Sequence, residues 1–454
     1  MGLAHSEHSN PETVGEVATG TRIVRRDAHA PTQRVSCDIC VIGSGAAGIS
    51  AALEAARLGR RVILVDSLPV LGGQAVNSII GTFCGLFSNG DYGYQFTHGI
   101  ADDILSDLGA MDKALFYRHG PVTTVVYYDE VALGRWVEES VRKAGIVTIL
   151  GAIMRKVERN GRRVKSIELA TRYGDVIVEA TGFVDASGDA ALAWLGGFAC
   201  REPSGNPVFG TQMVVVENID ESAHPTRAQL AQKMEEKGEA YGLLRRNCVS
   251  FVIPGRNIAA LNMTHTETPL EPLAASKSTL DGKAQADLSV KFLMEQFPDC
   301  FGKAKIRSYG MPGIRQTRWI VGKHQLSLDE VRQGFRHPDA IGRTAWPVEL
   351  HDHGAGYAWQ TFPEDHAHYI PLGSLIPEEA DNLCAAGRCI DADLAALSSV
   401  RVMGPCMAMG AAAAHALDLA GSGSVQQIDV GALQKRLSDN LDRTDGGGKD
   451  RNLN

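Results

Sequence analysis

The chain has 454 residues, enough for two or three domains at roughly 150 residues each and for a large buried core. Its 45 basic and 53 acidic residues give a net charge of −8, so no excess positive charge is available to neutralise a nucleic-acid backbone. No apolar run reaches the roughly 18 residues of a membrane-spanning helix, and the N-terminus lacks the apolar stretch of a secretory signal. A cytoplasmic protein without nucleic-acid or membrane partners is expected.

Residues 1 to 35 carry prolines and glycines without a sustained period and are predicted to be a loose tail. Three elements should follow: a buried strand from Cys37 to Ile42, a helix of small residues from Ala46 to Leu58, and a second buried strand from Arg61 to Asp66. This order is typical of a β-α-β unit.

A Cys-x-x-Cys pair lies within the first predicted strand, at Cys37 and Cys40. In a regular strand, side chains three residues apart point to opposite faces, so the two sulfurs are not expected to meet. The pair is therefore interpreted as two buried structural thiols and not as a redox pair.

A Gly-x-Gly-x-x-Gly motif joins the first predicted strand to the first predicted helix, at Gly43, Gly45 and Gly48. The first glycine permits a tight turn, the second lets backbone approach a pyrophosphate, and the third lets helix and strand pack closely. The N–H groups at the helix start, around Ala46 and Ala47, are free to bind phosphate. The motif predicts a dinucleotide site.

Asp66 ends the second strand 23 residues after Gly43, where a carboxylate is expected to accept a hydrogen bond from a ribose hydroxyl. An acidic residue there favours a 2′-OH over a 2′-phosphate.

The sequence from Val131 to Thr181 predicts a helix, a strand and a three-stranded meander with an Asn160-Gly161 hairpin turn. These elements are Val131 to Ala144, Val147 to Leu150, Met154 to Val157, Val164 to Leu169 and Asp175 to Thr181.

Residues 36–204 are therefore assigned to the first part of a dinucleotide-binding domain. Between 205 and 365 the strand and helix patterns become irregular, and this stretch is predicted to form a substrate domain. A short strand from Leu383 to Gly387 and an Ala- and Gly-rich helix from Pro405 to Leu419 return to the first domain over 366–440. Residues 441–454 are predicted to be a second loose tail.

Three further motifs resemble those of FAD enzymes with the glutathione-reductase fold: Leu71-Gly72-Gly73-Gln74, Phe183-Val184-Asp185-Ala186-Ser187-Gly188-Asp189 and Ala386-Gly387-Arg388-Cys389. The nearest resemblance is to the bacterial FAD-dependent oxidoreductases, relatives of the fumarate reductase and L-aspartate oxidase flavoproteins. The motifs that carry it are Gly313 to Gly322, Glu349-Leu350-His351, Tyr369-Ile370-Pro371 with Leu375-Ile376-Pro377, and Ser399 to Met403 leading into Met409-Gly410.

The resemblance implies an α/β fold, with a Rossmann-like FAD-binding domain that carries a β-meander and an inserted α+β substrate domain. FAD is the expected cofactor. The residues expected to bind it are Gly43, Gly45, Ala46, Ala47, Gly48, Asp66, Gly72, Gly73, Gln74, Asp185, Gly188, Asp189, Gly387, Arg388, Arg401 and Met403.

The chain departs from the family pattern at Leu394, where a histidine is frequent. No second Gly-x-Gly-x-x-Gly follows a strand, so a separate NAD(P)H domain is not expected, and the electron acceptor is unknown. The sequence is compatible with a homo-oligomer.

His351 is the expected base, since it matches a family motif and a histidine titrates near neutral pH; its neighbour His353 is the alternative. A group titrating at about pH 6 to 7 should then control flavin reduction. Arg315, with Arg318 nearby, is expected to hold a carboxylate or the flavin. His351-Asp352-His353 lacks a third clear ligand, so no metal is predicted there.

The first functional hypothesis is oxidation of a small polar metabolite, by hydride transfer to flavin N5 from a carbon that bears a hydroxyl or an amine. The alternatives are reduction of an activated C=C bond, with Arg315 and Arg318 as anion clamps, and a noncatalytic dinucleotide-binding redox sensor.

Overall fold

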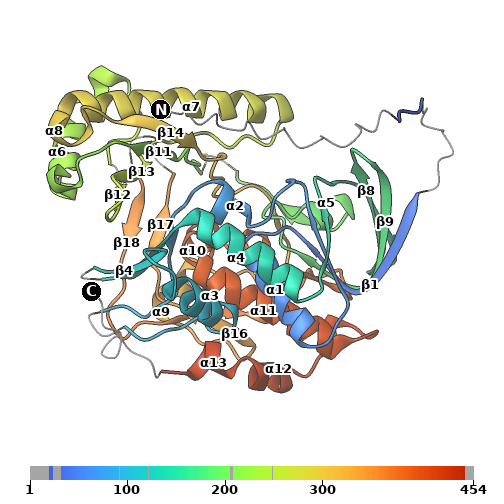
Figure 1. The fold of residues 1–454 in the computed structure, drawn as a ribbon. Helices are drawn as coiled ribbons and strands as arrows, with labels where there is room; N and C mark the ends of the chain where they lie inside the picture. Colours follow the sequence, from blue (N-terminus) through green and yellow to red (C-terminus); the bar gives the residue numbers. More distant parts are fainter. Residues whose placement is uncertain are drawn as a thin grey trace, which may run out of the picture.

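The fold is built around a seven-stranded mixed sheet (Figure 1). The computed structural model describes residues 20–23, 32–90, 93–120, 122–204, 208–247, 249–352, 354 and 356–444. The main sheet contains β1 (Gln33–Ile42), β2 (Val62–Asp66), β6 (Val147–Leu150), β7 (Ile153–Asn160), β8 (Arg163–Thr171), β9 (Gly174–Asp185) and β20 (Leu383–Ala385).

Two kinds of pairing share this sheet. Strands β6, β2, β1, β9 and β20 run parallel in that spatial order, whereas β7, β8 and the first half of β9 form the antiparallel meander. The long strand β9 joins the two parts, because Gly174 to Glu179 pair with β8 and Phe183 to Asp185 pair with β20. The carboxyl ends of the parallel strands therefore meet at one edge, where ligands bind in sheets of this kind.

The predicted elements of this part are confirmed, and β1, β7, β8 and β9 are longer than expected. β1 begins at Gln33, because Gln33 to Ser36 pair with Val176 to Glu179 of β9, so the predicted tail ends earlier than residue 35. The predicted C-terminal tail also starts later, since α13 includes Leu441. Residues 1–19, 24–31 and 445–454, where the two tails were also predicted, lie outside the described residues.

Helices α1 (Ala46–Arg57) and α11 (Met403–Ala420) pack directly against each other beside the sheet, with α3 (Ile100–Gly109) and α4 (Glu130–Lys143) next to α1 (Figure 1). Alanines and glycines line the contact between α1 and α11. A Cβ on Gly410 would lie 2.1 Å from the carbonyl oxygen of Ala47 and 2.8 Å from the Cβ of Ser50. The two backbones can approach this closely only because Gly410 has no side chain.

The irregular middle of the chain contains a second sheet. It is antiparallel, in the order β12 (Val249–Ile253), β13 (Ile258–Asn262), β11 (Val214–Glu217), β14 (Lys305–Tyr309). The 25-residue helix α7 (Pro272–Gln296) runs along it (Figure 1). Val214 and Val216 of β11 share a buried cluster with Val290 of α7, whereas Val215 points to the opposite face. This alternation is what a sheet covered on both faces requires.

The remaining elements are short pieces that connect these two parts. The strands are β3 (Thr82–Phe83), β4 (Leu115–His119), β5 (Thr124–Tyr128), β10 (Cys200–Arg201), β15 (Trp319–Ile320), β16 (Ala340–Thr344), β17 (Val348–Leu350), β18 (Ala358–Gln360) and β19 (His368–Pro371). The helices are α2 (Gly73–Asn77), α5 (Ala191–Leu195), α6 (Arg227–Lys237), α8 (Pro298–Phe301), α9 (Leu328–Gln333), α10 (Leu394–Val400), α12 (Val430–Arg436) and α13 (Ser438–Asp442), with 3₁₀ turns including η3 (Leu372–Ser374).

The prediction that Cys37 and Cys40 lie on opposite faces is wrong. β1 is irregular at Asp38, because the N–H groups of Asp38 and Ile39 both donate to the carbonyl of Arg61, at 2.9 and 3.2 Å. As a result, Cys37 and Cys40 belong to one buried cluster. The hydrogen bond between the two thiols, together with burial, raises the pKa of Cys40 well above its usual value. Both cysteines are buried, free thiols.

Within the described residues, no single helix has both the length and the apolar character needed to cross a membrane. The consecutive helices α10 and α11 meet those criteria only when taken together, and they are bent by 90°.

The close contact between α1 and α11 generates the first prediction. Gly410→Ala should lower the free energy of unfolding by about 1–3 kcal/mol, because the added methyl group overpacks a backbone contact that has no room for it. Denaturant unfolding of the FAD-loaded protein measures the effect. The matched control is Gly109→Ala at the end of α3, where an added Cβ meets nothing within 4 Å. Equal stability of the two variants would contradict the packing argument.

Candidate functional site

The glycine motif forms a tight turn at the start of α1, with room for a ligand at its second glycine. Gly43 has φ +98°, and a Cβ there would lie 2.3 Å from the carbonyl oxygen of Ala186. A Cβ on Gly48 would lie 1.8 Å from the Gly43 carbonyl oxygen. At Gly45, the residue before α1, an added Cβ meets nothing within 4 Å. The N–H groups of the first turn, from Ala46 and Ala47 on, have no partner inside the helix.

Asp66 lies beside this turn and is buried. Its Oδ2 accepts hydrogen bonds from the N–H and the hydroxyl of Ser44, at 2.7 and 2.6 Å, and its Oδ1 accepts one from the N–H of Leu68 at 2.8 Å. The carboxylate therefore fixes the backbone just before Gly45. The contact with a ribose hydroxyl stays a prediction.

The Leu71 to Gln74 motif crosses directly over the glycine turn. The N–H of Gly72 donates to the Ser44 carbonyl at 3.1 Å, and a Cβ on Gly73 would lie 2.5 Å from the Cα of Gly45. Gln74 Nε2 donates to the carbonyl of Ile314 at 3.1 Å. This last contact joins the turn to the segment that carries Arg315.

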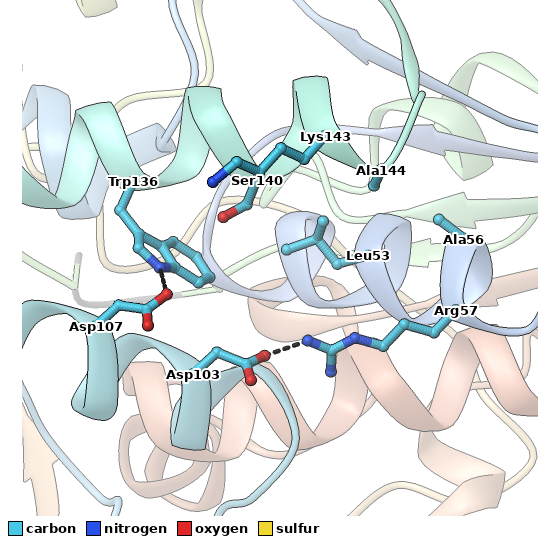
Figure 2. A pocket seen from close by; sticks show the side chains of 9 residues that line it. All are labelled: Leu53, Ala56, Arg57, Asp103, Asp107, Trp136, Ser140, Lys143 and Ala144. Atoms are coloured by element: carbon cyan, nitrogen blue, oxygen red, sulfur yellow. Dashed lines mark hydrogen bonds and ion pairs between the residues drawn. The ribbon is translucent and has the colours of Figure 1, made fainter.

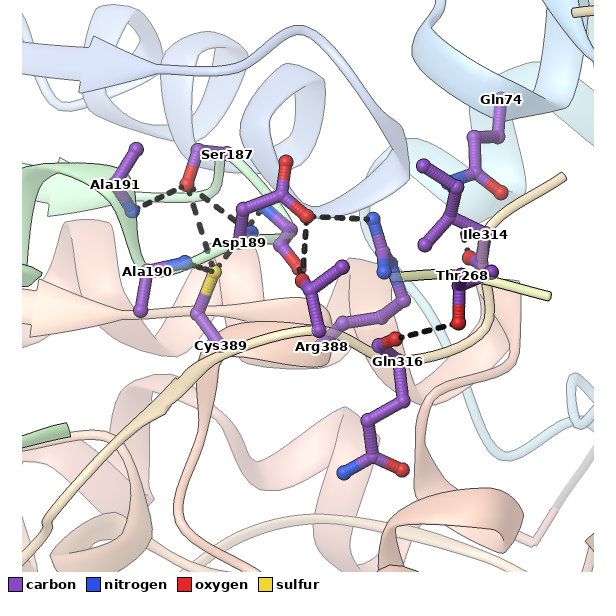
Figure 3. A network of polar contacts seen from close by, with 12 residues as sticks. Gln74, Ser187, Asp189, Ala190, Ala191, Thr268, Ile314, Gln316, Arg388 and Cys389 are labelled. Atoms are coloured by element: carbon purple, nitrogen blue, oxygen red, sulfur yellow. Dashed lines mark hydrogen bonds and ion pairs between the residues drawn. The ribbon is translucent and has the colours of Figure 1, made fainter. Parts of the chain in front are cut away.

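Asp185 is fully buried at the end of β9, and its carboxylate is occupied by its own loop. Oδ1 accepts from the N–H and hydroxyl of Ser187, and Oδ2 accepts from the N–H groups of Leu192 and Ala193. Cys389 Sγ accepts hydrogen bonds from the N–H groups of Gly188 and Ala190 in the same loop (Figure 3). Asp185 thus shapes the loop that carries Gly188, and its part in the site is indirect.

Asp189 and Arg388 lie beside each other next to that loop (Figure 3). Asp189 Oδ1 accepts a hydrogen bond from the hydroxyl of Thr317 at 2.5 Å and lies 3.7 Å from Arg388 Nη2. A Cβ on Gly188 would lie 2.4 Å from the same nitrogen, and one on Gly387 would lie 3.2 Å from the Cβ of Ala47. Four motifs far apart in sequence therefore meet at the start of α1.

The predicted cofactor residues near α11 form the other end of this region. Met403 is the first residue of α11, with its Sδ 3.9 Å from the hydroxyl of Tyr128. Arg401, just before it, donates through Nη2 to the carbonyl of Glu349 at 3.3 Å. Burial, together with the charge of Arg388, lowers the pKa of Arg401, although Glu349 acts in the opposite direction.

Three residues of this region have buried hydrogen-bond donors without a partner. Within the described ranges, Arg388 Nη1, Gln316 Nε2 and Arg401 Nε are buried and have no acceptor. A buried donor left unpaired is costly, so such groups commonly mark the place of a ligand. FAD presents pyrophosphate oxygens and flavin carbonyls, which are all acceptors. The residues present therefore fit FAD.

A chain of acid and base groups lies beside Arg401. Glu349 Oε1 is 3.1 Å from His351 Nε2, His351 Nδ1 is 3.0 Å from His265 Nε2, and His265 Nδ1 is 2.9 Å from the carbonyl oxygen of Gly354. We refer to Glu349, His351 and His265 as the relay. Glu349 Oε2 also accepts from the indole N–H of Trp346 at 3.2 Å.

The relay can bind one more proton than two neutral imidazoles provide. Its three hydrogen bonds run between two acceptors, the Glu349 carboxylate and the Gly354 carbonyl, so they need three protons. Burial and the charge of Arg315 lower the pKa of His351 to about 2. Burial raises the pKa of Glu349, but its hydrogen bond with His351 and the charges of His351, Arg401 and Arg315 prevail and lower it to about 2. At neutral pH the pair is therefore an ionised carboxylate beside a neutral imidazole.

Only one member of the relay is open to solvent. The Glu349 side chain is 24% exposed, whereas that of His351 is 0% exposed. His351 also uses both ring nitrogens inside the relay. The geometry therefore favours Glu349 over His351 as the group that meets a substrate, and the base role of His351 stays a prediction. His353, the predicted alternative base, lies outside the described residues.

Arginines surround the relay. Arg315 is buried and donates to the Phe209 carbonyl at 2.8 Å, and Arg245 is buried with its guanidinium on the amide oxygens of Asn247 and Asn262. Burial, followed by the charges of Arg401 and Arg245, lowers the pKa of Arg315 well below its usual value. Among the described residues, Arg315 forms no ion pair, so an anionic ligand would be favourable there.

Other predicted candidates lie elsewhere. Arg318 pairs with Glu202 at 2.5 Å and lies over the ring of Trp194, so it does not form a clamp with Arg315. His366 and His368 form a hydrogen-bonded pair. His368 is buried against the Ser399 hydroxyl, and burial lowers its pKa to about 3, so we interpret the pair as structural.

Sequence reasoning missed Glu349, His265 and Arg245 as site residues. Glu349 could have been found, because it stands two positions before His351 and alternate residues of an extended segment share a face. His265 and Arg245 carry no such signal, since His265 lies in the segment after β13 and Arg245 in the segment before β12.

A surface groove of about 380 Å³ lies between α1, α3 and α4 (Figure 2). Its residues from α1 are Leu53, Ala56 and Arg57, at the opposite end of that helix from Gly45. At about 1.5 Å per residue, a 12-residue helix separates the groove from the glycine turn by more than 10 Å. The groove is therefore not part of the candidate site.

The glycine turn, the parallel sheet and the unpaired donors together define a dinucleotide-binding α/β protein that fits FAD. The chain belongs to the FAD dependent oxidoreductase family, whose model matches residues 38–437. It is therefore an enzyme with FAD as its cofactor, and the redox-sensor interpretation is set aside.

Curated relatives match a short stretch. A fumarate reductase (cytochrome) of Shewanella frigidimarina is 41% identical over 75 residues, which are 16% of this chain and 13% of that protein. Its counterpart from strain NCIMB 400 is 41% identical over 63 residues, 14% of this chain and 10% of that protein.

Among solved structures, a geranylgeranyl bacteriochlorophyll reductase-like protein from Thermoplasma acidophilum has 12% identity and a TM-score of 0.46, with 90% of this chain and 85% of that chain covered. The flavin-dependent brominase Bmp2 has 13% identity and a TM-score of 0.44, with 89% and 83% covered.

The open space at Gly45 generates the second prediction. Gly45→Val should fold but lose FAD, because its side chain would occupy the space where the pyrophosphate is expected. The absorbance of purified protein at flavin and protein wavelengths gives the FAD content, and circular dichroism checks the fold. Gly109→Val, at the end of α3 and also open, is the matched control and should stay loaded. A fully loaded Gly45→Val would place the cofactor elsewhere.

Proposed function

We propose that this enzyme oxidises a small polar metabolite that carries an anionic group, by removing hydride from a carbon bearing a hydroxyl or an amine. The observation that carries the proposal is the partly exposed, ionised carboxylate of Glu349, which forms the open end of the relay and stands beside Arg315 and Arg401. A base next to a cation is what a hydroxy or amino acid requires.

Each side chain then has a part in the reaction. Arg315 binds the anionic group of the substrate and orients the carbon. Glu349 accepts the proton of the hydroxyl or amine, and His351 and His265 share it through hydrogen bonds that are already formed. Bound FAD supplies the hydride acceptor at flavin N5. Arg401 would stabilise the negative charge that gathers on a reduced flavin.

We also propose that residues 205–365 form the substrate domain. Arg245, His265, Arg315, Glu349 and His351 all belong to that range, whereas Arg388 and Arg401 belong to the returning segment. The hydrogen bond from Arg401 to the Glu349 carbonyl supports a substrate domain that packs against the segment expected to bind the flavin.

A second candidate function is reduction of an activated C=C bond in an unsaturated acid. Arg315 favours it, since a buried guanidinium that donates only to the Phe209 carbonyl among the described residues has further N–H groups to clamp an anion. An anaerobic panel separates the two candidates: a hydroxy or amino acid that bleaches the oxidised flavin supports the first, and an unsaturated acid that reoxidises the reduced flavin supports the second.

The base role of Glu349 gives the third prediction. Glu349→Gln should slow anaerobic flavin reduction by roughly 10² to 10⁴, the usual contribution of a positioned general base, and keep its FAD. Stopped-flow absorbance with the best substrate of the panel measures the rate. The exposed Glu379→Gln is the matched control and should react like the wild type. A Glu349→Gln enzyme of unchanged rate would remove Glu349 from the mechanism.

The fourth prediction concerns pH. Because the pKa values of Glu349 and His351 are both lowered to about 2, neither group changes its protonation state across the neutral range. Flavin reduction by a hydroxy acid should therefore be constant from about pH 5 to 8 and fall only at lower pH, as Glu349 becomes protonated. A transition near pH 6 to 7 that disappears in His351→Asn would restore His351 as the direct base, as the sequence suggested.

A further inference from the structure

We propose that His324, Glu330 and His337 form a Zn²⁺ site, separate from the flavin chemistry. The three side chains can each offer one ligand atom, and these atoms all lie within 4.8 Å of one another. His324 Nε2 and Glu330 Oε1 are already 3.0 Å apart. Ligands about 2 Å from a tetrahedral ion lie roughly 3.3 Å from each other, so a small adjustment of the side chains brings the set to that spacing.

The second observation is the state of His337. It is 5% exposed, and its Nε2 is buried without a hydrogen-bond partner in the described part of the chain. Its ring lies edge to face against His324, with centroids 4.9 Å apart. A buried imidazole nitrogen left without a partner, beside a second imidazole and a carboxylate, is explained by a ligand that the three groups share.

The supporting contacts hold the ligands in place. Glu330 is the third residue of α9, and its Oε2 accepts from the N–H and hydroxyl of Ser327 at 2.8 and 2.9 Å. Its Oε1 and Oε2 lie 3.0 and 3.2 Å from His324 Nε2, so an ion bound by Oε1 and that nitrogen would replace their direct contact. The backbone of His324 is held by Gly373 and Ser374 of η3. Such second contacts fix the orientation of metal ligands.

The ligand chemistry favours zinc. Two imidazoles and one carboxylate, with water in the fourth position, suit Zn²⁺, whereas Mg²⁺ and Ca²⁺ prefer oxygen ligands alone. The His324 side chain is 39% exposed, which leaves a path for the ion. Bound zinc would tie the loop after β15, the first turn of α9 and the loop before β16 into one unit.

The experiment is a Zn²⁺ titration of the full-length, FAD-loaded protein, prepared without a metal-affinity tag and dialysed against a chelator. Competition with a chromophoric chelator measures affinity, and the melting temperature with and without zinc measures coupling to folding. One zinc per chain and a raised melting temperature are expected. Mg²⁺ is the comparison ion and should bind far more weakly.

The variants make the assignment specific. His337→Ala and Glu330→Gln should each weaken zinc binding by about 100-fold or more and abolish the thermal shift. Glu330→Gln keeps an oxygen for the Ser327 contacts, so it separates loss of the ligand from loss of the helix cap. His224→Ala, which removes a half-buried histidine bonded to Ser250, is the matched control and should bind zinc normally. A wild type that binds no zinc, or binding that survives both variants, would overturn the proposal.

Discussion

The rest of the site depends on glycines that let backbone segments pack in direct contact where α1 begins. Gly73 stands against Gly45, Gly48 against the carbonyl of Gly43, and Gly410 against the carbonyl of Ala47, at distances that no Cβ could occupy. These contacts bring the helix N-terminus, the crossing turn and α11 to one point. The cofactor site depends on this packing, because the free N–H groups and the open space at Gly45 exist only when all three segments are that close.

The second organising feature is the burial of charge around the relay. Arg315 and Arg401 lie close enough to Glu349 to hold its carboxyl ionised against burial, and Arg315 helps to keep His351 neutral. The same charges therefore create a base and a place for an anion. Burying such groups is unfavourable unless they pair, so the cluster is better explained by binding and catalysis than by stability.

Much of the first domain was predictable because its signals are local. The turn at Gly43 to Gly48, the strand that delivers Asp66 and the hairpin at Asn160 are each specified by a few adjacent residues, and the structure has all of them. The motifs at Asp189 and Arg388 were also recognisable in order along the chain. Asp185 illustrates the limit of this reasoning. Its motif indicated a contact with the cofactor, whereas its carboxylate accepts hydrogen bonds from the N–H groups of Leu192 and Ala193.

The sequence by itself determined the dinucleotide-binding turn and the β-α-β unit around it, since these follow from backbone requirements and local spacing, and its other motifs implied FAD by their resemblance to known flavoenzymes. Only the tertiary structure decided which titratable groups meet. His265 and His351 are 86 residues apart and form one relay, and exposure, which no local pattern encodes, makes Glu349 and not His351 the open end. Likewise Cys37 and Cys40 share a face because β1 is irregular at Asp38, where two N–H groups compete for one carbonyl of a neighbouring segment. Long-range packing sets burial, and burial sets the chemistry of each group.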